Sequence, residues 1–158
     1  MQKRLQTMSN HDVIIGVLND SSEEVAARLD ALMGHLTQSP RPRLTVERLR
    51  AIVASPHIRL FVAEQQGVIV GTLTAAHYTA PVGEKLWIED VVVAPEARGC
   101  GIGRRLVAAA VEYGALHHPQ STICLTSNPA RTEARRLYTS LGFELYDTGF
   151  FRLKPTPK

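Results

Sequence analysis

The chain has 158 residues, of which 44% are hydrophobic and 21% charged, and its formal net charge is +3. These values are typical of a soluble globular protein and indicate neither a mostly disordered chain nor a membrane protein. The length suits one domain with its own core, and the small basic excess does not indicate a nucleic-acid-binding surface.

Neither the start of the chain nor its apolar runs predict a targeting or membrane segment. Residues 1–10 are polar, lack a signal-peptide core and are expected to be irregular or disordered. No apolar run approaches the roughly 20 residues that a membrane span requires. We therefore expect a cytoplasmic protein whose single domain covers 11–158. Cys100 and Cys124 lack metal-ligand spacing and are expected to be free thiols.

The first third of the chain predicts a strand followed by two helices. Residues 12–18 are rich in β-branched side chains, which favour a strand. Ser21, with a glutamate three residues later, has the spacing of a capping box that opens a helix ending before residue 40. Apolar residues at helical spacing in 45–54 predict a second helix, which the following Ser-Pro ends.

The middle of the chain alternates strands and one long helix. Residues 58–65 and 68–78 flank a glycine-containing turn and are expected to form an antiparallel hairpin. A further strand is predicted over 85–93. The apolar residues of 101–117 fall at helical spacing, and 121–126 then form a short strand.

The last part of the chain predicts one helix and two short strands. Asn128 and Pro129 are typical of an N-cap and a first helical position, and Gly142 is expected to end the helix. Short strands are expected at 143–146 and 150–153. Because strands flank helices throughout, the chain is predicted to be a layered α/β or α+β domain.

The clearest chemical signal lies in residues 89–106, E-D-V-V-V-A-P-E-A-R-G-C-G-I-G-R-R-L. A β-branched strand runs into a turn with Gly99, Gly101 and Gly103 and then directly into a helix. Glycines let a backbone approach a ligand closely, and the start of a helix attracts phosphate. The dinucleotide fingerprint and the P-loop both have different spacings. The turn therefore predicts a pyrophosphate site; the alternative is that its glycines serve packing only.

Two segments resemble the motifs of a known enzyme superfamily. Residues 98–103 resemble the Q/R-x-x-G-x-G/A signature of the GNAT acetyltransferases, and 128–144 resemble the next motif of that superfamily. The resemblance implies a GNAT-like mixed, mostly antiparallel sheet flanked by helices. It also implies an N-acetyltransferase that moves an acetyl group from acetyl-CoA directly to a primary amine of a small-molecule or peptide acceptor, without a metal.

The resemblance also assigns residues to the acetyl-CoA site. In the family the turn amides hold the CoA pyrophosphate, and the preceding strand pairs with the pantetheine arm after separating from the strand at Cys124. Many members carry asparagine where this chain has Arg131. The residues assigned to the cofactor are Val91, Val92, Val93, Arg98, Gly99, Cys100, Gly101, Ile102, Gly103, Arg104, Asn128 and Arg131.

Glu89 is the candidate catalytic base. An alkylamine is protonated at pH 7, and providing its free base costs about 4.6 kcal/mol, so a group that accepts the proton is needed. Glu89 stands late on the strand expected beside the acetyl group and would act directly or through a water. Asp90 would point to the opposite face, although a bulge would exchange the two roles. The alternative for Glu89 is an ion pair or the binding of a cationic substrate.

Tyr138 matches the tyrosine that the family places at the CoA sulfur, where it is usually assigned as the general acid. A tyrosine with pKa ~10 gives its proton to a thiolate of pKa ~8.5 only at a cost of about 2 kcal/mol. Hydrogen bonding to the departing sulfur is therefore expected as much as full proton donation. The alternative is a tyrosine that only packs in the core.

Other features carry weaker hypotheses. Cys100 as an acyl-carrying nucleophile has no histidine paired with it in the sequence. The pair His117–His118 ends a predicted helix and has no further metal ligand beside it. Apolar residues after Gly142 suggest a homodimer. The alternative function is a catalytically silent acyl-CoA-binding sensor or partner-binding module of the same fold.

Overall fold

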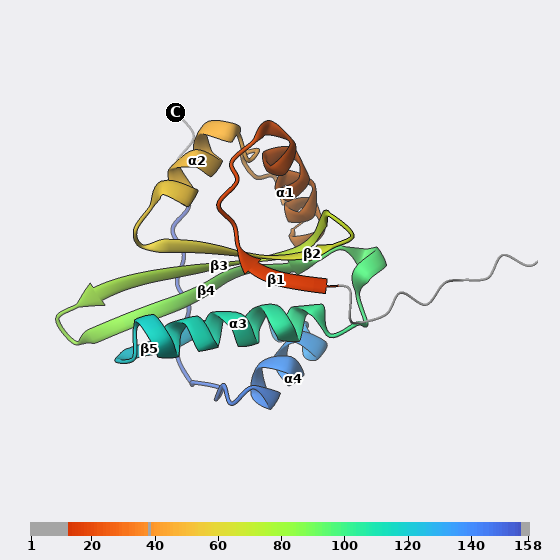
Figure 1. Ribbon diagram of the computed structural model, residues 1–158. Coiled ribbons are helices and arrows are strands. Elements are labelled where there is room, and N and C mark those ends of the chain that lie inside the picture. The colour runs from red at the N-terminus through yellow and green to blue at the C-terminus, as the bar shows by residue number, and fades with distance from the viewer. Residues whose placement is uncertain (1–12, 38, 156–158) are drawn as a thin grey trace, which may run out of the picture. The chain divides into compact units, whose positions relative to one another are not determined.

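The computed structural model describes residues 13–37 and 39–155 (Figure 1). Residues 1–10, expected to be disordered, lie outside the described residues. The chain divides into two compact units, residues 1–126 and 127–158. The first unit contains every strand of the described residues, and the second contains one helix.

The first unit is built on a five-stranded sheet with the strand order β1-β2-β3-β4-β5. Neighbouring strands from β1 to β4 are antiparallel, while β4 and β5 are parallel. The mixed, mostly antiparallel sheet expected from the sequence is therefore confirmed. The strands are β1 Val13–Val17, β2 Ile58–Gln65, β3 Val68–Ala80, β4 Gly83–Val93 and β5 Ser121–Leu125.

Helices cover both faces of this sheet (Figure 1). Helices α1 (Glu23–Leu36) and α2 (Val46–Ala54) lie on one face, and α3 (Ile102–His117) lies on the other. Helix α1 packs against β3 and β4, whereas α3 crosses all five strands. Within the described residues, no helix is both long and apolar enough to cross a membrane. The core side chains with no measurable exposure include Leu32, Leu49, Leu73, Leu106 and Val107.

The two helix starts were predicted with different success. The second helix forms where the sequence indicated, and Thr45 caps it by accepting the Arg48 N–H at 3.2 Å. Helix α1 is capped by Ser22 rather than Ser21, and Ser22 Oγ accepts the Val25 N–H at 3.4 Å. The shift has a local cause, because Asp20 Oδ1 accepts the Ser22 N–H at 2.8 Å and fixes this serine in front of the helix.

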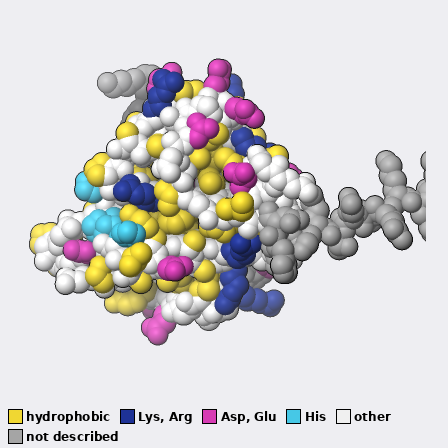
Figure 2. Space-filling view, viewed as in Figure 1, with side chains coloured by type: hydrophobic (Ala, Val, Ile, Leu, Met, Phe, Trp, Pro, Cys, Tyr) yellow, Lys and Arg dark blue, Asp and Glu magenta, His cyan; other side chains and the backbone are white. Residues whose placement is uncertain are grey.

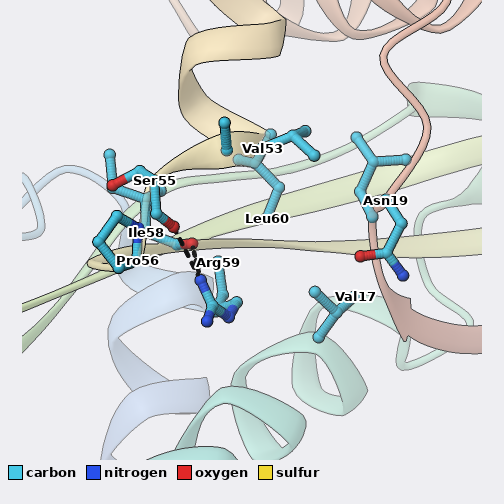
Figure 3. A pocket seen from close by; sticks show the side chains of 10 residues that line it. Val17, Asn19, Val53, Ser55, Pro56, Ile58, Arg59 and Leu60 are labelled. Carbon is cyan, nitrogen blue, oxygen red and sulfur yellow. Dashed lines mark hydrogen bonds between the residues drawn. The ribbon is translucent and has the colours of Figure 1, made fainter.

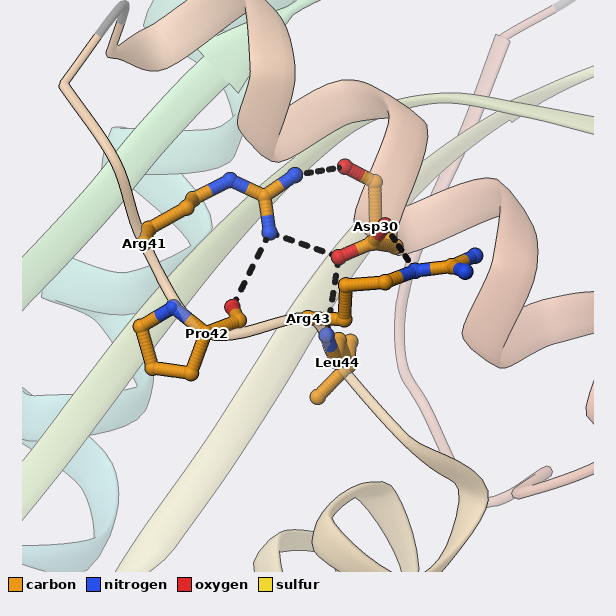
Figure 4. Close-up of polar contacts among 5 residues, drawn as sticks. All are labelled: Asp30, Arg41, Pro42, Arg43 and Leu44. Atoms are coloured by element: carbon orange, nitrogen blue, oxygen red, sulfur yellow. Dashed lines mark hydrogen bonds and ion pairs between the residues drawn. The ribbon is translucent and has the colours of Figure 1, made fainter.

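A partly buried carboxylate ties α1 to the segment that leads into α2 (Figure 4). Arg41 Nη1 donates to Asp30 Oδ1 at 2.6 Å, and the Leu44 N–H donates to the same oxygen at 2.8 Å. Arg43 Nε lies 3.6 Å from the other oxygen. The hydrogen bonds from Arg41 and Leu44 hold the pKa of Asp30 below its usual value. Asp30 thus fixes the connection between two helices that cover the same face of the sheet.

The second unit differs from expectation before and after its helix, α4 (Thr132–Ser140), although the helix ends ahead of Gly142, which has φ +91°, as predicted. Asn128 Oδ1 accepts the Ala130 N–H at 2.9 Å, which forms a side-chain turn, and the helix begins only at Thr132. The strands predicted at 143–146 and 150–153 do not form in the described residues. An extended segment needs a partner for its backbone groups, and the described residues of this unit provide no strand that could pair with it.

Candidate active site

A β-bulge interrupts β4 at the predicted acidic pair. Thr74 pairs with Glu89 and Thr72 pairs with Val92, so Asp90 and Val91 together stand opposite the one residue between the two threonines. Asp90 has φ +52°, in the left-handed region that glycine takes in one common type of bulge. The strand is therefore not regular at Asp90, and the bulge that the sequence left open is present.

The parallel pairing between β4 and β5 ends at the residue before Glu89. Ile88 and Leu125 are the last pair, and no strand of the described residues pairs with 89–93 on the side away from β3. The ladder ends here because β5 itself ends at Leu125, and the bulge that follows bends β4 and increases its local twist. No second strand of the described residues therefore takes up the backbone groups of Val91, Val92 and Val93 on this side, and of these groups the Val93 carbonyl oxygen accepts a hydrogen bond from Arg98.

Glu89 and Asp90 form an acidic pair, and the pKa values of both carboxyl groups differ from their ordinary values. Burial and the neighbouring charge of Asp90 raise the pKa of Glu89, and burial raises the pKa of Asp90. Both side chains are nevertheless accessible from solvent. Within residues 13–37 and 39–155, neither carboxylate takes part in an ion pair. This counts against the alternative of an internal ion pair for Glu89 and leaves the pair available to a cationic group.

A short 3₁₀ turn, η2 (Pro95–Ala97), follows β4, and the glycine turn comes next. Gly99 has φ +78° and Gly101 has φ +72°, and α3 begins at Ile102. A Cβ built on either glycine would meet no atom within 4 Å. The two glycines are required by their backbone angles, not by close packing, which excludes the packing-only alternative for them. The space outside the turn is open, as a site for an approaching phosphate must be.

Arginine side chains hold both ends of this turn to the sheet. Arg98 Nε donates to the Val93 carbonyl oxygen at 3.1 Å and joins the turn to the end of β4. Arg105 Nη2, in the first turn of α3, donates to the Val13 carbonyl oxygen on β1 at 2.8 Å. These bonds fix the direction in which the N-terminus of α3 points. Cys100 and Cys124 are free thiols, and Cys100 is exposed on the turn.

The cofactor residues predicted on β4 and the turn therefore form one continuous strand-turn-helix element in the first unit. Asn128, Arg131 and Tyr138 belong to the second unit, before and within α4. Tyr138 is 7% exposed, and its ring centre lies 6.1 Å from that of Phe143. Burial raises the pKa of Tyr138, while the charge of Arg131 opposes that change. Arg131 is exposed at the N-cap of α4, and the Asn128 side-chain oxygen is engaged in its own turn.

A pocket of about 290 Å³ opens at the edge of β2 beyond the end of β1 (Figure 3). Its charged side chain, Arg59, donates from Nη1 to the carbonyl oxygens of Ser55 at 3.0 Å and Ile58 at 2.7 Å. No acidic residue lines the pocket. Leu60 in its wall pairs with Thr74, which pairs with Glu89. The carboxylates that would attract a cationic amine, those of Glu89 and Asp90, therefore lie two strands away from this pocket.

Comparisons with known proteins point to one protein family. The model of the "Acetyltransferase (GNAT) family" matches residues 26–143. A putative acetyltransferase from Agrobacterium tumefaciens strain C58 superposes with a TM-score of 0.76 at 26% identity, covering 89% of this chain and 99% of that chain. A transcriptional regulator from Bacillus halodurans C-125 gives a TM-score of 0.72 at 29% identity, with coverages of 90% and 99%.

A third solved structure is similar in fold alone. An aminoglycoside N-acetyltransferase, solved in complex with CoA, has a TM-score of 0.74 at 20% identity and covers 91% of this chain and 95% of its own. No curated protein matched the chain.

Proposed function

The chain belongs to the GNAT acetyltransferase family, and from that premise we propose that it is a cytoplasmic N-acetyltransferase which transfers an acetyl group from acetyl-CoA directly to a primary amine. The observation that carries this proposal is the open glycine turn beside an unpaired strand edge. Gly99 and Gly101 face open space at the start of α3, and β4 has lost its β5 partner from Glu89 onward. One element thus offers both a phosphate site and a strand edge.

This arrangement suits the chemistry of acetyl-CoA. Backbone N–H groups at the start of a helix and the positive end of its dipole stabilise a pyrophosphate. The edge of β4 beyond its last β5 pair can bind the amide groups of the pantetheine arm in the way that one strand adds to another, while Arg98 holds the Val93 carbonyl oxygen at the end of this edge. Val91, Val92 and Val93 need only favour a strand for this role, which leaves specificity for CoA to the turn. Arg98 and Arg104 lie beside the turn, where positive charge favours phosphate.

Glu89 serves as the base in this proposal. A primary amine must lose a proton before its nitrogen attacks the thioester carbonyl carbon; the new C–N bond forms and the C–S bond breaks. The raised pKa of Glu89 brings it closer to the pKa of the amine than an ordinary carboxylate, which improves a base. The charge of Asp90 next to it also attracts the cationic amine before it is deprotonated.

Tyr138 serves the sulfur that leaves. Burial raises the pKa of this phenol above its ordinary value, so complete proton transfer to a CoA thiolate is more unfavourable than for an exposed tyrosine. We therefore assign to Tyr138 a hydrogen bond that strengthens as negative charge develops on the sulfur. The proton itself can reach the thiolate later from solvent.

A release assay tests the proposed reaction. The protein is incubated with acetyl-CoA and a panel of diamines, aminoglycosides, amino acids and peptides with free N-termini, and free CoA thiol is measured over time. The proposal expects amine-dependent thiol release and an acetylated amine detected by mass spectrometry. Thiol release that is equal with and without every amine would contradict it.

A second candidate function is an acyl-CoA-binding sensor of the same fold. It is favoured by the similarity to a protein described as a transcriptional regulator. A sensor would bind acetyl-CoA at the same turn and release no thiol with any amine. The presence of an accessible acidic pair without an internal partner favours the enzyme, because a sensor gains nothing from two carboxylates held at raised pKa.

We also propose that the protein forms a homodimer through the segment after Gly142. Large apolar side chains in this segment are between 73% and 97% exposed, and its backbone forms no strand. Such a segment suits pairing with a second copy of the chain. Sedimentation at a concentration on the order of tens of micromolar tests this, and a clean monomer would contradict it. The exposed apolar residues are Leu145, Tyr146, Phe150, Phe151 and Leu153.

A further inference from the structure

Three potential metal ligands converge at the end of the sheet remote from the glycine turn. They are His77 on β3, Glu84 on β4 and His118, which follows α3 directly. The candidate donor atoms of the three side chains all lie within 4.8 Å of one another. Figure 2 shows histidine side chains gathered at one place on this face of the molecule. The His77 and Glu84 side chains are only 16% and 32% exposed.

The register of the sheet explains how these residues meet. His77 pairs with Leu86 and Thr79 pairs with Glu84, so His77 and Glu84 are diagonal neighbours across the hairpin. Glu84 also pairs with Ser121 on β5, and the Ser121 N–H donates to the His118 carbonyl oxygen at 2.9 Å. Two strands and the end of a helix thereby hold the cluster from three directions.

The distances fit a small divalent cation. His77 Nε2 lies 3.4 Å from Glu84 Oε2. Two ligands of a tetrahedral zinc ion with bonds of ~2.1 Å are about 3.4 Å apart, so this pair already has the required separation. Ser121 Oγ lies 3.3 Å from the same carboxylate oxygen and orients Glu84, as a partner behind a metal ligand typically does.

We propose that His77, Glu84 and His118 form a binding site for a divalent transition-metal ion, for which zinc is best suited. Two imidazoles and one carboxylate are a common zinc ligand set, and a water can complete the tetrahedron. The rings of His77 and His118 are stacked, with centres 3.7 Å apart and planes 16° from parallel. One ion cannot lie in the plane of both parallel rings, so metal binding separates the stack by turning one ring.

Metal binding at this site would raise the stability of the folded protein and would take no part in acetyl transfer. Helix α3 has 16 residues and is about 24 Å long, and the cluster lies at the end opposite the glycine turn. A metal ion here would join the β3–β4 hairpin to the C-terminal end of α3, two parts of the fold that are distant in sequence. An ion that binds only the folded protein raises its stability in proportion to the logarithm of its concentration.

The test uses tag-free protein stripped of metal with a chelator. Zinc chloride is titrated by calorimetry, and the thermal midpoint is measured with and without zinc. We expect one zinc ion per chain with a raised midpoint, and at least about tenfold weaker binding in Glu84→Gln and His118→Ala. His35→Ala removes an exposed histidine of α1 and serves as the control that keeps wild-type affinity.

Cobalt provides a second readout that does not depend on stability. A tetrahedral Co²⁺ site with nitrogen and oxygen ligands gives a characteristic visible absorption, which we expect in the wild-type protein and in His35→Ala but not in His118→Ala. Absence of stoichiometric zinc binding in the wild-type protein would overturn the proposal. So would equal zinc affinity in the wild-type protein, Glu84→Gln and His118→Ala. Neither result would affect acetyl-CoA binding at the glycine turn.

Discussion

Ile88 on β4 and Leu125 on β5 are the last pair of their parallel ladder, and the bulge at Asp90 follows within two residues. The extra residue of the bulge bends β4 where the acidic pair begins, directly after the β4–β5 ladder ends. The residue in the bulge that takes the unusual conformation is Asp90, a non-glycine residue held at φ +52°. Burial raises the pKa values of both carboxyl groups, and the charge of Asp90 further raises that of Glu89.

The strain at Asp90 predicts an unusual order of stabilities. An L residue in the left-handed region carries a penalty that glycine avoids, so Asp90→Gly should be more stable than Asp90→Ala by about 1 kcal/mol. At Glu89, where the backbone is ordinary strand, alanine should instead be more stable than glycine by about 0.5–1 kcal/mol. Urea denaturation of the four variants measures both differences. The same order at both positions would show that the bulge is not strained.

Replacement of Glu89 predicts a pH-dependent loss of activity. Glu89→Gln should lower the single-turnover rate by about 100-fold at pH 7, and the defect should shrink towards pH 9.5 as the amine loses its own proton. In the wild-type protein the rate should fall as pH drops through the raised pKa of Glu89, because the base becomes protonated. Glu112→Gln, on the exposed side of α3, is the control. A Glu89→Gln defect that stays constant across this range would reassign Glu89 to substrate binding.

Replacement of Tyr138 predicts a loss of turnover without a loss of affinity. Tyr138→Phe removes a hydrogen bond made mainly as the sulfur becomes anionic, so turnover should fall by about 100-fold with little change in the acetyl-CoA dissociation constant. Tyr146→Phe removes an exposed hydroxyl from the same unit and should leave both values unchanged. Steady-state kinetics and calorimetry give the two quantities. Equal turnover in Tyr138→Phe and the wild-type protein would leave this tyrosine with a packing role only.

The sequence was most informative where a local rule decides the structure. The glycine turn was predicted because residues with positive φ are strongly restricted to glycine, and Gly99 and Gly101 both have such angles. The cap at Thr45 and the hairpin turn before β3 follow equally local rules. These features fix the element that carries the proposed cofactor site.

The features that depend on distant partners were not predictable. Residues 143–146 and 150–153 are rich in the apolar and aromatic side chains that favour strands, but the described residues of their unit form no strand. In the sequence, His117 and His118 have no further metal ligand beside them. His77 and Glu84 come close to His118 only through the register of the sheet. Asp90 gives no sign in the sequence that it will take a glycine-like conformation.

The carboxylate of Asp30 predicts a pH-dependent contribution to stability. Its pKa is lowered in the folded protein, so its stabilisation is fully present above the ordinary carboxylate pKa and is lost as pH falls through the lowered value. Asp30→Asn should reduce the free energy of unfolding by about 2 kcal/mol at pH 7, since it removes charged hydrogen bonds. The difference from the wild-type protein should narrow towards pH 3. Asp147→Asn, at an exposed site, is the control for urea denaturation at each pH.

Calorimetric titration of acetyl-CoA into the wild-type protein and Gly101→Val tests the central claim most directly. Valine cannot readily take φ +72° and would place a branched side chain in the open space outside the turn, although no protein atom lies within 4 Å there to be displaced. We expect saturable binding by the wild-type protein and no measurable binding by Gly101→Val, with circular dichroism showing that the variant is folded. Equal affinity in the two proteins, or no binding by the wild-type protein, would contradict the assignment of this turn to acetyl-CoA.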